Sequence, residues 1–183
     1  MTGHNRPTDV ELVAGANAGD AQAFDALYDR HRTWAYRVAF RFTGEASDAL
    51  DVVQETFLYV LQQFPGLELR SRFTTYLYPI IRSVAMDGHR RLAREQLARE
   101  AATEHHRAHE EDEAHTARSD ELEHLLDALS AGQREVLLMR VIDSMTMSEI
   151  ATALSIPEGT AKSRLHGALT RLRADPRTSD LFA

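Results

Sequence analysis

The chain has 183 residues, of which 43% are hydrophobic and 27% charged, a composition typical of a soluble globular protein with one large or two small domains. It contains no cysteine, which excludes disulfides, thiolate nucleophiles and cysteine-based zinc sites. No apolar run approaches the roughly 20 residues that span a bilayer, and the amino terminus lacks the layout of a secretory signal. We therefore expect a cytoplasmic protein that does not insert into a membrane.

The net charge of −7 at first argues against nucleic-acid binding, but this charge is unevenly distributed. Residues 104–123 hold eight acidic residues against two arginines, a net charge of −6. By contrast, residues 70–99 carry a net charge of +5 and residues 159–177 a net charge of +4. Either basic segment alone is better explained as a solvated helix face. Two of them, separated by an acidic segment, fit DNA binding better than the total charge suggests.

Apolar residues recur at spacings of three and four, without alternation at period two, which predicts an all-α protein. A first helix is predicted over 8–18, where Thr8 and Glu11 have the spacing of a capping box. Asp20 is the expected cap of a second helix, which Gly44 ends. Two further helices are predicted in this half, over 46–64 and from 71–73 to beyond Arg94.

The third predicted helix has an apolar stripe and an acidic side. Its expected core residues are Leu50, Val53, Phe57, Val60, Leu61 and Phe64. The opposite side carries Asp48, Asp51, Glu55 and Gln62, with Leu58 among them. Such a face could dock a basic partner helix, although taken alone it is better explained as an ordinary solvated face.

The fourth predicted helix combines aromatic residues with arginines. Its members are Phe73, Tyr76 and Tyr78 together with Arg70, Arg72, Arg82, Arg90, Arg91 and Arg94. Unpaired bases stack on aromatic rings while cations hold their backbone, so this combination is typical of single-strand binding. For Phe73 and Leu77 we expect burial in the core instead.

A linker and a small second domain follow. Large apolar residues nearly vanish between 95 and 118, which predicts a segment that is partly helical or disordered. Beyond it, helices are predicted over 120–129, 133–142, 147–154 and 157–173.

The last two of these helices form a predicted helix-turn-helix. Thr146 and Glu149 make a capping box at the start of the first, and Pro157 suits the start of the second. The second helix would serve as a recognition helix in the major groove. Its expected outer face consists of Thr160, Lys162, Ser163, Arg164, His166 and Arg171.

Together these segments resemble the extracytoplasmic-function group of bacterial RNA polymerase sigma factors. The similarity to sigma region two is carried by residues 19–28, 51–58 and 73–91, and the similarity to region four by residues 129–137 and 158–166. The resemblance implies an all-α fold of two small helical domains. These are region two over 8–95, a flexible acidic linker over 96–118, and region four with its helix-turn-helix over 119–175.

The resemblance also implies roles for individual residues in promoter-specific transcription initiation. Docking on the clamp helices of the largest polymerase subunit would use Asp48, Asp51, Gln54, Glu55 and Leu58. The melted −10 strand, with one base flipped out, would meet the loop over 64–72 and the basic helix through Arg70, Arg72, Tyr76, Arg82, Arg90 and Arg91. The −35 element would be read by Thr160, Lys162, Ser163, Arg164, His166 and Arg171.

The implied partners are core RNA polymerase, through its clamp helices and flap, promoter DNA, and an anti-sigma factor. Catalysis would belong to the polymerase, so no enzymatic site, cofactor or metal is expected in this chain. The sequence departs from the family where Tyr76 replaces a frequent Trp, Pro79 an Arg, and Ser83 an Asn. A proline at position 79 should kink the helix, and Gly167 stands where a basic residue is common.

Two other interpretations are open at this stage. A stand-alone helix-turn-helix regulator with a helical sensing domain would have a similar carboxy-terminal half, but it leaves the docking helix and the arginine-rich helix unexplained. A metal site would rest on His105, His106, His109 and His115. That stretch lacks an apolar frame and the HExxH pattern, so a histidine-rich polar linker is favoured.

Overall fold

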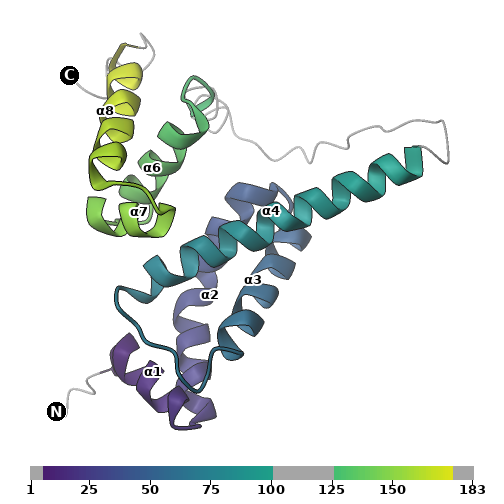
Figure 1. Ribbon diagram of the computed structural model, residues 1–183, viewed down its shortest axis with the longest axis vertical. Coiled ribbons are helices and arrows are strands. Elements are labelled where there is room, and N and C mark those ends of the chain that lie inside the picture. Colours follow the sequence, from purple (N-terminus) through teal and green to yellow (C-terminus); the bar gives the residue numbers. More distant parts are fainter. Residues whose placement is uncertain (1–5, 101–125, 175–183) are drawn as a thin grey trace. The chain divides into compact units, whose positions relative to one another are not determined.

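The computed structural model describes residues 6–100 and 126–174, with side chains described up to residue 88 in the first range. Within these ranges the chain is helical and has no strand. It forms two compact units, one within residues 1–105 and one within 106–183 (Figure 1). The helices are α1 (Asp9–Asn17), α2 (Ala21–Thr43), α3 (Ala46–Leu61), α4 (Phe73–Glu100), α6 (Ala131–Val141), α7 (Met147–Leu154) and α8 (Glu158–Ala174).

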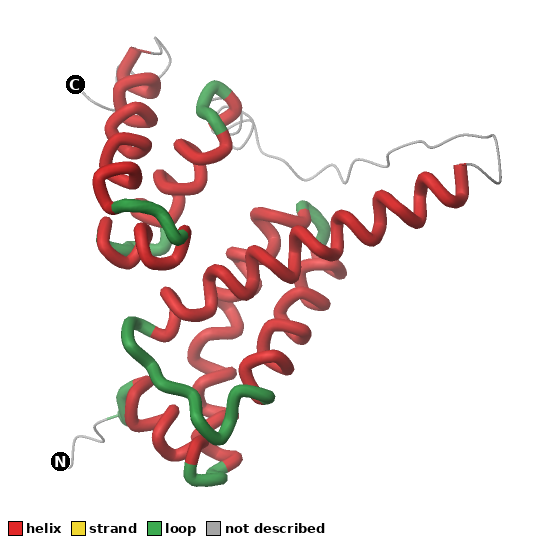
Figure 2. Tube along the Cα trace, in the orientation of Figure 1, coloured by secondary structure: helices red, strands yellow, loops and turns green. Residues whose placement is uncertain are grey.

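The first unit is built around α2, which packs against α1, α3 and α4, while α3 also packs against α4 (Figure 2). Its largest fully buried side chains come from α2 and α4 and are Leu27, Phe73, Leu77, Tyr78 and Ile81. Each such apolar side chain stabilises the fold by roughly 1.5–3 kcal/mol relative to remaining in water. No helix in the described ranges is long and apolar enough to cross a bilayer.

The predicted helix starts in this unit are confirmed. Thr8 caps α1, and its capping box with Glu11 is complete. Asp20 caps α2 by accepting from the backbone N–H of Gln22, and Gly44 ends that helix in the left-handed conformation with φ of 73°. Glycine suits this last position because it has no Cβ to clash.

The prediction for α3 was wrong in two respects. The helix ends at Leu61 rather than Phe64, and Phe64 itself is disfavoured in a helix by the proline that follows it. Val53, Phe57 and Val60 are buried as expected, but the buried face is rotated, since Ala49, Val52 and Thr56 also point inward. Leu50 and Leu61, which were expected in the core, are 53% and 47% exposed.

The fourth helix runs through Pro79 and continues to Glu100, which lies inside the segment predicted as a partly helical linker. The proline ring lies on the exposed side of the helix. The acidic part of the linker over 104–118, including His105, His106, His109 and His115, falls outside the described residues.

The second unit is a helix-turn-helix supported by α6. Its buried centre is formed by Val136, Met139, Met145, Ile150 and Ala161, all 0% exposed. Thr146 and Glu149 form the predicted capping box of α7. Ser155 ends α7 in the left-handed conformation and thereby turns the chain toward α8. Of the helix predicted over 120–129, residues 120–125 are outside the described ranges.

Candidate functional site

The exposed side of α3 carries three leucines and a glutamine in a row, bordered by acidic residues. Leu50, Gln54, Leu58 and Leu61, here called the α3 stripe, are spaced by four, four and three residues, so they share one helix face. All four are exposed, and Leu58 is 59% exposed. Asp51 and Glu55 are also exposed and border the stripe, while Asp48 is half-buried. The structure thus brings four of the five predicted docking residues to one open face, and the sequence had assigned Leu50 and Leu61 to the wrong side.

The segment 62–72 joins α3 to α4 and presents basic side chains. Arg70 is 87% exposed and pairs with Glu68 at 3.0 Å. Arg72 is also exposed and precedes α4. Leu67, by contrast, is only 8% exposed. The segment is therefore anchored at its centre, whereas the side chains of Arg70 and Arg72 near its carboxy-terminal end are exposed.

Among the aromatic residues of α4, only Tyr76 is partly accessible. Phe73 and Leu77 are fully buried, as expected, and Tyr78 is 2% exposed, which contradicts its predicted role in stacking on bases. Tyr76 is half-buried, with its ring centroid 6.1 Å from that of Phe73. Burial, and to a lesser extent the neighbouring Tyr59, raises the pKa of the Tyr76 hydroxyl above its ordinary value.

The predicted −10 arginines divide along α4. Arg82 lies on the exposed surface of the helix. Arg90 and Arg91 belong to the helix as well, but their side chains fall outside the described residues.

The predicted −35 residues divide between two sides of α8. Lys162, Ser163 and His166 are exposed, and Lys162 pairs with Glu158 one turn earlier at 2.7 Å. Ala161 and Ala168 are fully buried beneath them. The exposed side chains therefore project from a helix whose opposite face is packed in the core of the unit, and this packing holds their orientation.

Arg164 and Arg171 instead contact the start of α6 and the residues just before it. Thr160 and Arg164 are half-buried, and the Arg164 guanidinium lies so close to Gly132 that a Cβ there would be 3.2 Å from its central carbon. Arg171 donates from Nη1 to the carbonyl of Ala128 at 3.0 Å. Gly167 lies on this side too, since a Cβ on it would meet the Gln133 side chain at 2.6 Å. A basic residue at 167 would thus first have to displace Gln133.

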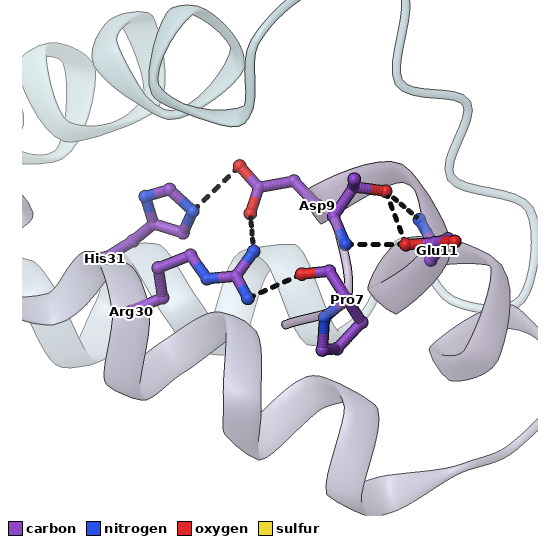
Figure 3. A network of polar contacts seen from close by, with 6 residues as sticks. Pro7, Asp9, Glu11, Arg30 and His31 are labelled. Atoms are coloured by element: carbon purple, nitrogen blue, oxygen red, sulfur yellow. Dashed lines mark hydrogen bonds and ion pairs between the residues drawn. The ribbon is translucent and has the colours of Figure 1, made fainter. Parts of the chain in front are cut away.

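A polar network that joins α1 to α2 was missed at the sequence level (Figure 3). The Asp9 carboxylate accepts from Arg30 Nη1 at 2.6 Å and contacts His31 Nε2 at 3.0 Å. Since a carboxylate only accepts, His31 Nε2 carries the proton in this contact. Arg30 also donates to the Pro7 carbonyl at 2.7 Å. Partners more than 20 positions apart leave no local signal in a sequence.

Two family models match the chain, one for each unit. Sigma-70 region 2 matches residues 27–95, and Sigma-70, region 4 matches residues 119–172. Among curated proteins, the ECF RNA polymerase sigma factor SigL of Mycobacterium tuberculosis is 37% identical over 170 residues, which cover 88% of this chain and 93% of that protein. The ECF RNA polymerase sigma factor SigW of Bacillus subtilis is 26% identical, with coverage of 87% and 91%.

Solved structures show the same architecture. CnrH, solved in complex with the cytosolic domain of CnrY, is 27% identical with a TM-score of 0.64, over 91% of this chain and 95% of that one. RpoE of Bartonella quintana, solved with the anti-sigma factor NepR, has a TM-score of 0.64 at 21% identity, which supports the fold. The chain therefore belongs to the extracytoplasmic-function sigma factors, the family that binds core RNA polymerase and directs promoter-specific transcription initiation.

Proposed function

We propose that the chain divides its sigma activity among three surfaces: α3 for polymerase docking, the 62–72 segment with α4 for the −10 element, and α8 for the −35 element. Region two would then comprise residues 8–95, the linker 96–118 and region four 119–175. Catalysis belongs to the polymerase and not to this chain. The protein works in the cytoplasm beside that polymerase.

The observation that carries the proposal is the α3 stripe. An unpartnered row of leucines bordered by Asp51 and Glu55 suits a partner helix that has both apolar and basic residues. The clamp helices of the largest polymerase subunit are the proposed partner. A stand-alone DNA-binding regulator would have no use for such a face.

The basic segment and helix are proposed to hold the melted −10 strand. Arg70 and Arg72 are exposed at the end of the segment, and Tyr76 follows in the first turn of α4 as its partly accessible aromatic residue, so cations for phosphates and a ring for stacking come from neighbouring positions of the chain. Arg82, Arg90 and Arg91 would extend this surface along α4. Tyr78 is not part of it because it is buried in the core.

The −35 element is proposed to be read mainly by Lys162, Ser163 and His166. These side chains are exposed on the outer face of α8, which the capped α7 and the turn at Ser155 hold in place. Thr160, Arg164 and Arg171 are proposed to act at the edge of this contact, since Arg164 and Arg171 also contact the α6 side of the unit.

The solved relatives suggest a regulator as well. CnrH is bound to the cytosolic domain of CnrY, and RpoE to the anti-sigma factor NepR. An anti-sigma factor that covers the docking surfaces of this chain is the corresponding proposal, and the flap of the polymerase is the proposed partner of region four.

The test is promoter-dependent transcription with purified chain and core RNA polymerase, on its own upstream region and on a genomic fragment pool. Specific starts that require both components are expected, and they would reveal the −35 and −10 sequences. Protection of DNA by the chain alone, with no specific starts, would instead favour the stand-alone regulator.

Matched variants assign the surfaces. Leu58→Asp should weaken binding to core polymerase by at least about tenfold, whereas Val10→Asp, at an apolar residue that is 62% exposed on α1, should not.

Lys162→Ala should lower promoter affinity, whereas Arg32→Ala removes a similarly exposed positive charge on α2 and should leave promoter affinity unchanged. Equal effects of a variant and its control would contradict the assignment.

A further inference from the structure

The last residue of α1, Asn17, is bonded to the segment between α3 and α4. Its Nδ2 donates to the Leu67 carbonyl at 3.0 Å. Its Oδ1 accepts from the backbone N–H of Gly66 at 2.7 Å and of Leu67 at 3.1 Å. One side chain thus satisfies three backbone groups about 50 positions away in the sequence.

These bonds fix the centre of the segment. Gly66 has a φ of 128°, a conformation that residues with a side chain rarely adopt, and Leu67 is only 8% exposed. Backbone groups at a buried position need partners, and here no helix or strand supplies them. Asn17 does so.

The opposite end of α1 contacts the start of α4 through His31. Asp9 Oδ2 lies 3.0 Å from His31 Nε2 (Figure 3), and the centroid of the His31 ring is 4.9 Å from that of Phe73. Phe73 is the first residue of α4 and is fully buried. Helix α1 therefore braces the segment 62–72 at two points, directly at Gly66 and Leu67 and indirectly where α4 begins.

We propose that Asn17 is a positioning residue for −10 recognition. It would fix the backbone of the segment so that Arg70 and Arg72 reach the DNA from a defined place. The inference rests on the −10 role proposed above for this segment. A segment anchored before binding loses less conformational entropy when the strand binds, so anchoring improves both affinity and discrimination between bases.

The substitution Asn17→Ala removes all three bonds. Thr8→Ala is the matched control, because it removes the cap of α1 and weakens the same helix without touching Asn17. Arg70→Ala tests the segment itself, since the Arg70 side chain is exposed and pairs with Glu68 of the same segment. All three variants are made in the full chain and assembled with core polymerase on the promoter found by the transcription assay.

Two readouts separate positioning from a purely structural role. Amide hydrogen exchange at Gly66 and Leu67 should become about tenfold faster in Asn17→Ala, while the core amides of α2 and α3 keep their rates. In the same variant, transcription from the duplex promoter should fall about fivefold to tenfold, while affinity for core polymerase stays unchanged. The ratio of transcription from the native −10 sequence to transcription from promoters with single −10 substitutions should also decrease. Thr8→Ala, which keeps the three Asn17 bonds, should change the −10 preference less than Asn17→Ala does.

The outcomes that overturn the inference are distinct from those that overturn the proposed function. If Arg70→Ala lowers transcription while Asn17→Ala leaves the −10 preference unchanged, the positioning role is wrong and the −10 role of the segment stands. Equal losses of preference in Thr8→Ala and Asn17→Ala also overturn the positioning role. If neither Arg70→Ala nor Asn17→Ala changes transcription, the −10 role fails and the inference fails with it.

Discussion

Single residues set the boundaries of several elements and the protonation of two side chains. At the start of α1, the Thr8 N–H donates to Glu11 Oε2 at 2.7 Å and the Glu11 N–H to Thr8 Oγ1 at 3.3 Å. At the start of α4, the Tyr76 hydroxyl lies partly desolvated near Tyr59. Both environments lead to measurable pH effects of opposite sign.

The capping box should make α1 sensitive to acid. The Thr8 N–H, and then the Thr8 hydroxyl, stabilise the Glu11 carboxylate and hold its pKa below the ordinary value of 4.5. This stabilisation is present above pH 4.5 and is lost as the pH falls through the lowered pKa. In the Thr8→Ala variant, the pKa of Glu11 should rise part of the way back, which NMR titration of the carboxyl group can follow. An unchanged pKa would contradict this role of the hydroxyl.

Tyr76 should respond to alkali. Burial raises the pKa of its hydroxyl above 10.0, so the folded state favours the neutral phenol. The resulting stabilisation is complete below pH 10 and is lost as the pH rises through the raised pKa. Ultraviolet titration of the wild type against Tyr76→Phe should isolate one tyrosine that ionises above pH 10. A difference spectrum with a midpoint at or below 10 would refute the prediction.

At the level of elements, the residues at which a helix begins and ends depend on the local sequence, whereas the face that it buries depends on the helices packed against it. The caps of α1, α2 and α7 were predicted from the sequence because a cap and the N–H groups it binds lie within three residues of each other. The buried face of α3 was predicted only in part, at Val53, Phe57 and Val60. Its inward face includes the small or polar residues Ala49 and Thr56, whereas Leu50 and Leu61 are exposed. The positions of the leucines therefore predicted the wrong side of the helix.

Pro79 offers a test of element stability. It lies inside α4, where it removes one backbone donor, and its ring is exposed. Pro79→Ala should therefore raise the free energy of unfolding by about 1–3 kcal/mol, measured by urea denaturation. Ser83→Ala, at another exposed position of the same helix, is the control and should change stability by less than about 0.5 kcal/mol. A destabilised Pro79→Ala variant would mean that α4 requires the proline.

At the level of the whole molecule, the chain consists of two units that each bury a core of their own. Leu27 lies in the first core and Ile150 in the second, both with 0% exposure. Replacing either with Ala should cost about 2–5 kcal/mol because the deleted side chain leaves a cavity. The two proposed contacts, of the first unit with the −10 element and of the second with the −35 element, are therefore expected to fail separately.

Hydrogen exchange of the full chain can test this separation. Leu27→Ala should accelerate exchange in α2, α3 and α4 and leave α6, α7 and α8 unchanged, and Ile150→Ala should do the reverse. Acceleration of both units by either substitution would show that they unfold together.

The sequence by itself determined the all-helical class, most helix starts, the helix-turn-helix and the resemblance to the family, because these depend on spacings within a few residues and on motifs in order. Only the tertiary structure decided which side of α3 is open, that Tyr78 belongs to the core, and that Gly167 lies toward Gln133. It alone placed Asn17 against Gly66 and Leu67. A bond between residues 50 positions apart depends on how helices pack, and helix packing is set by the complementarity of whole faces rather than by any local pattern.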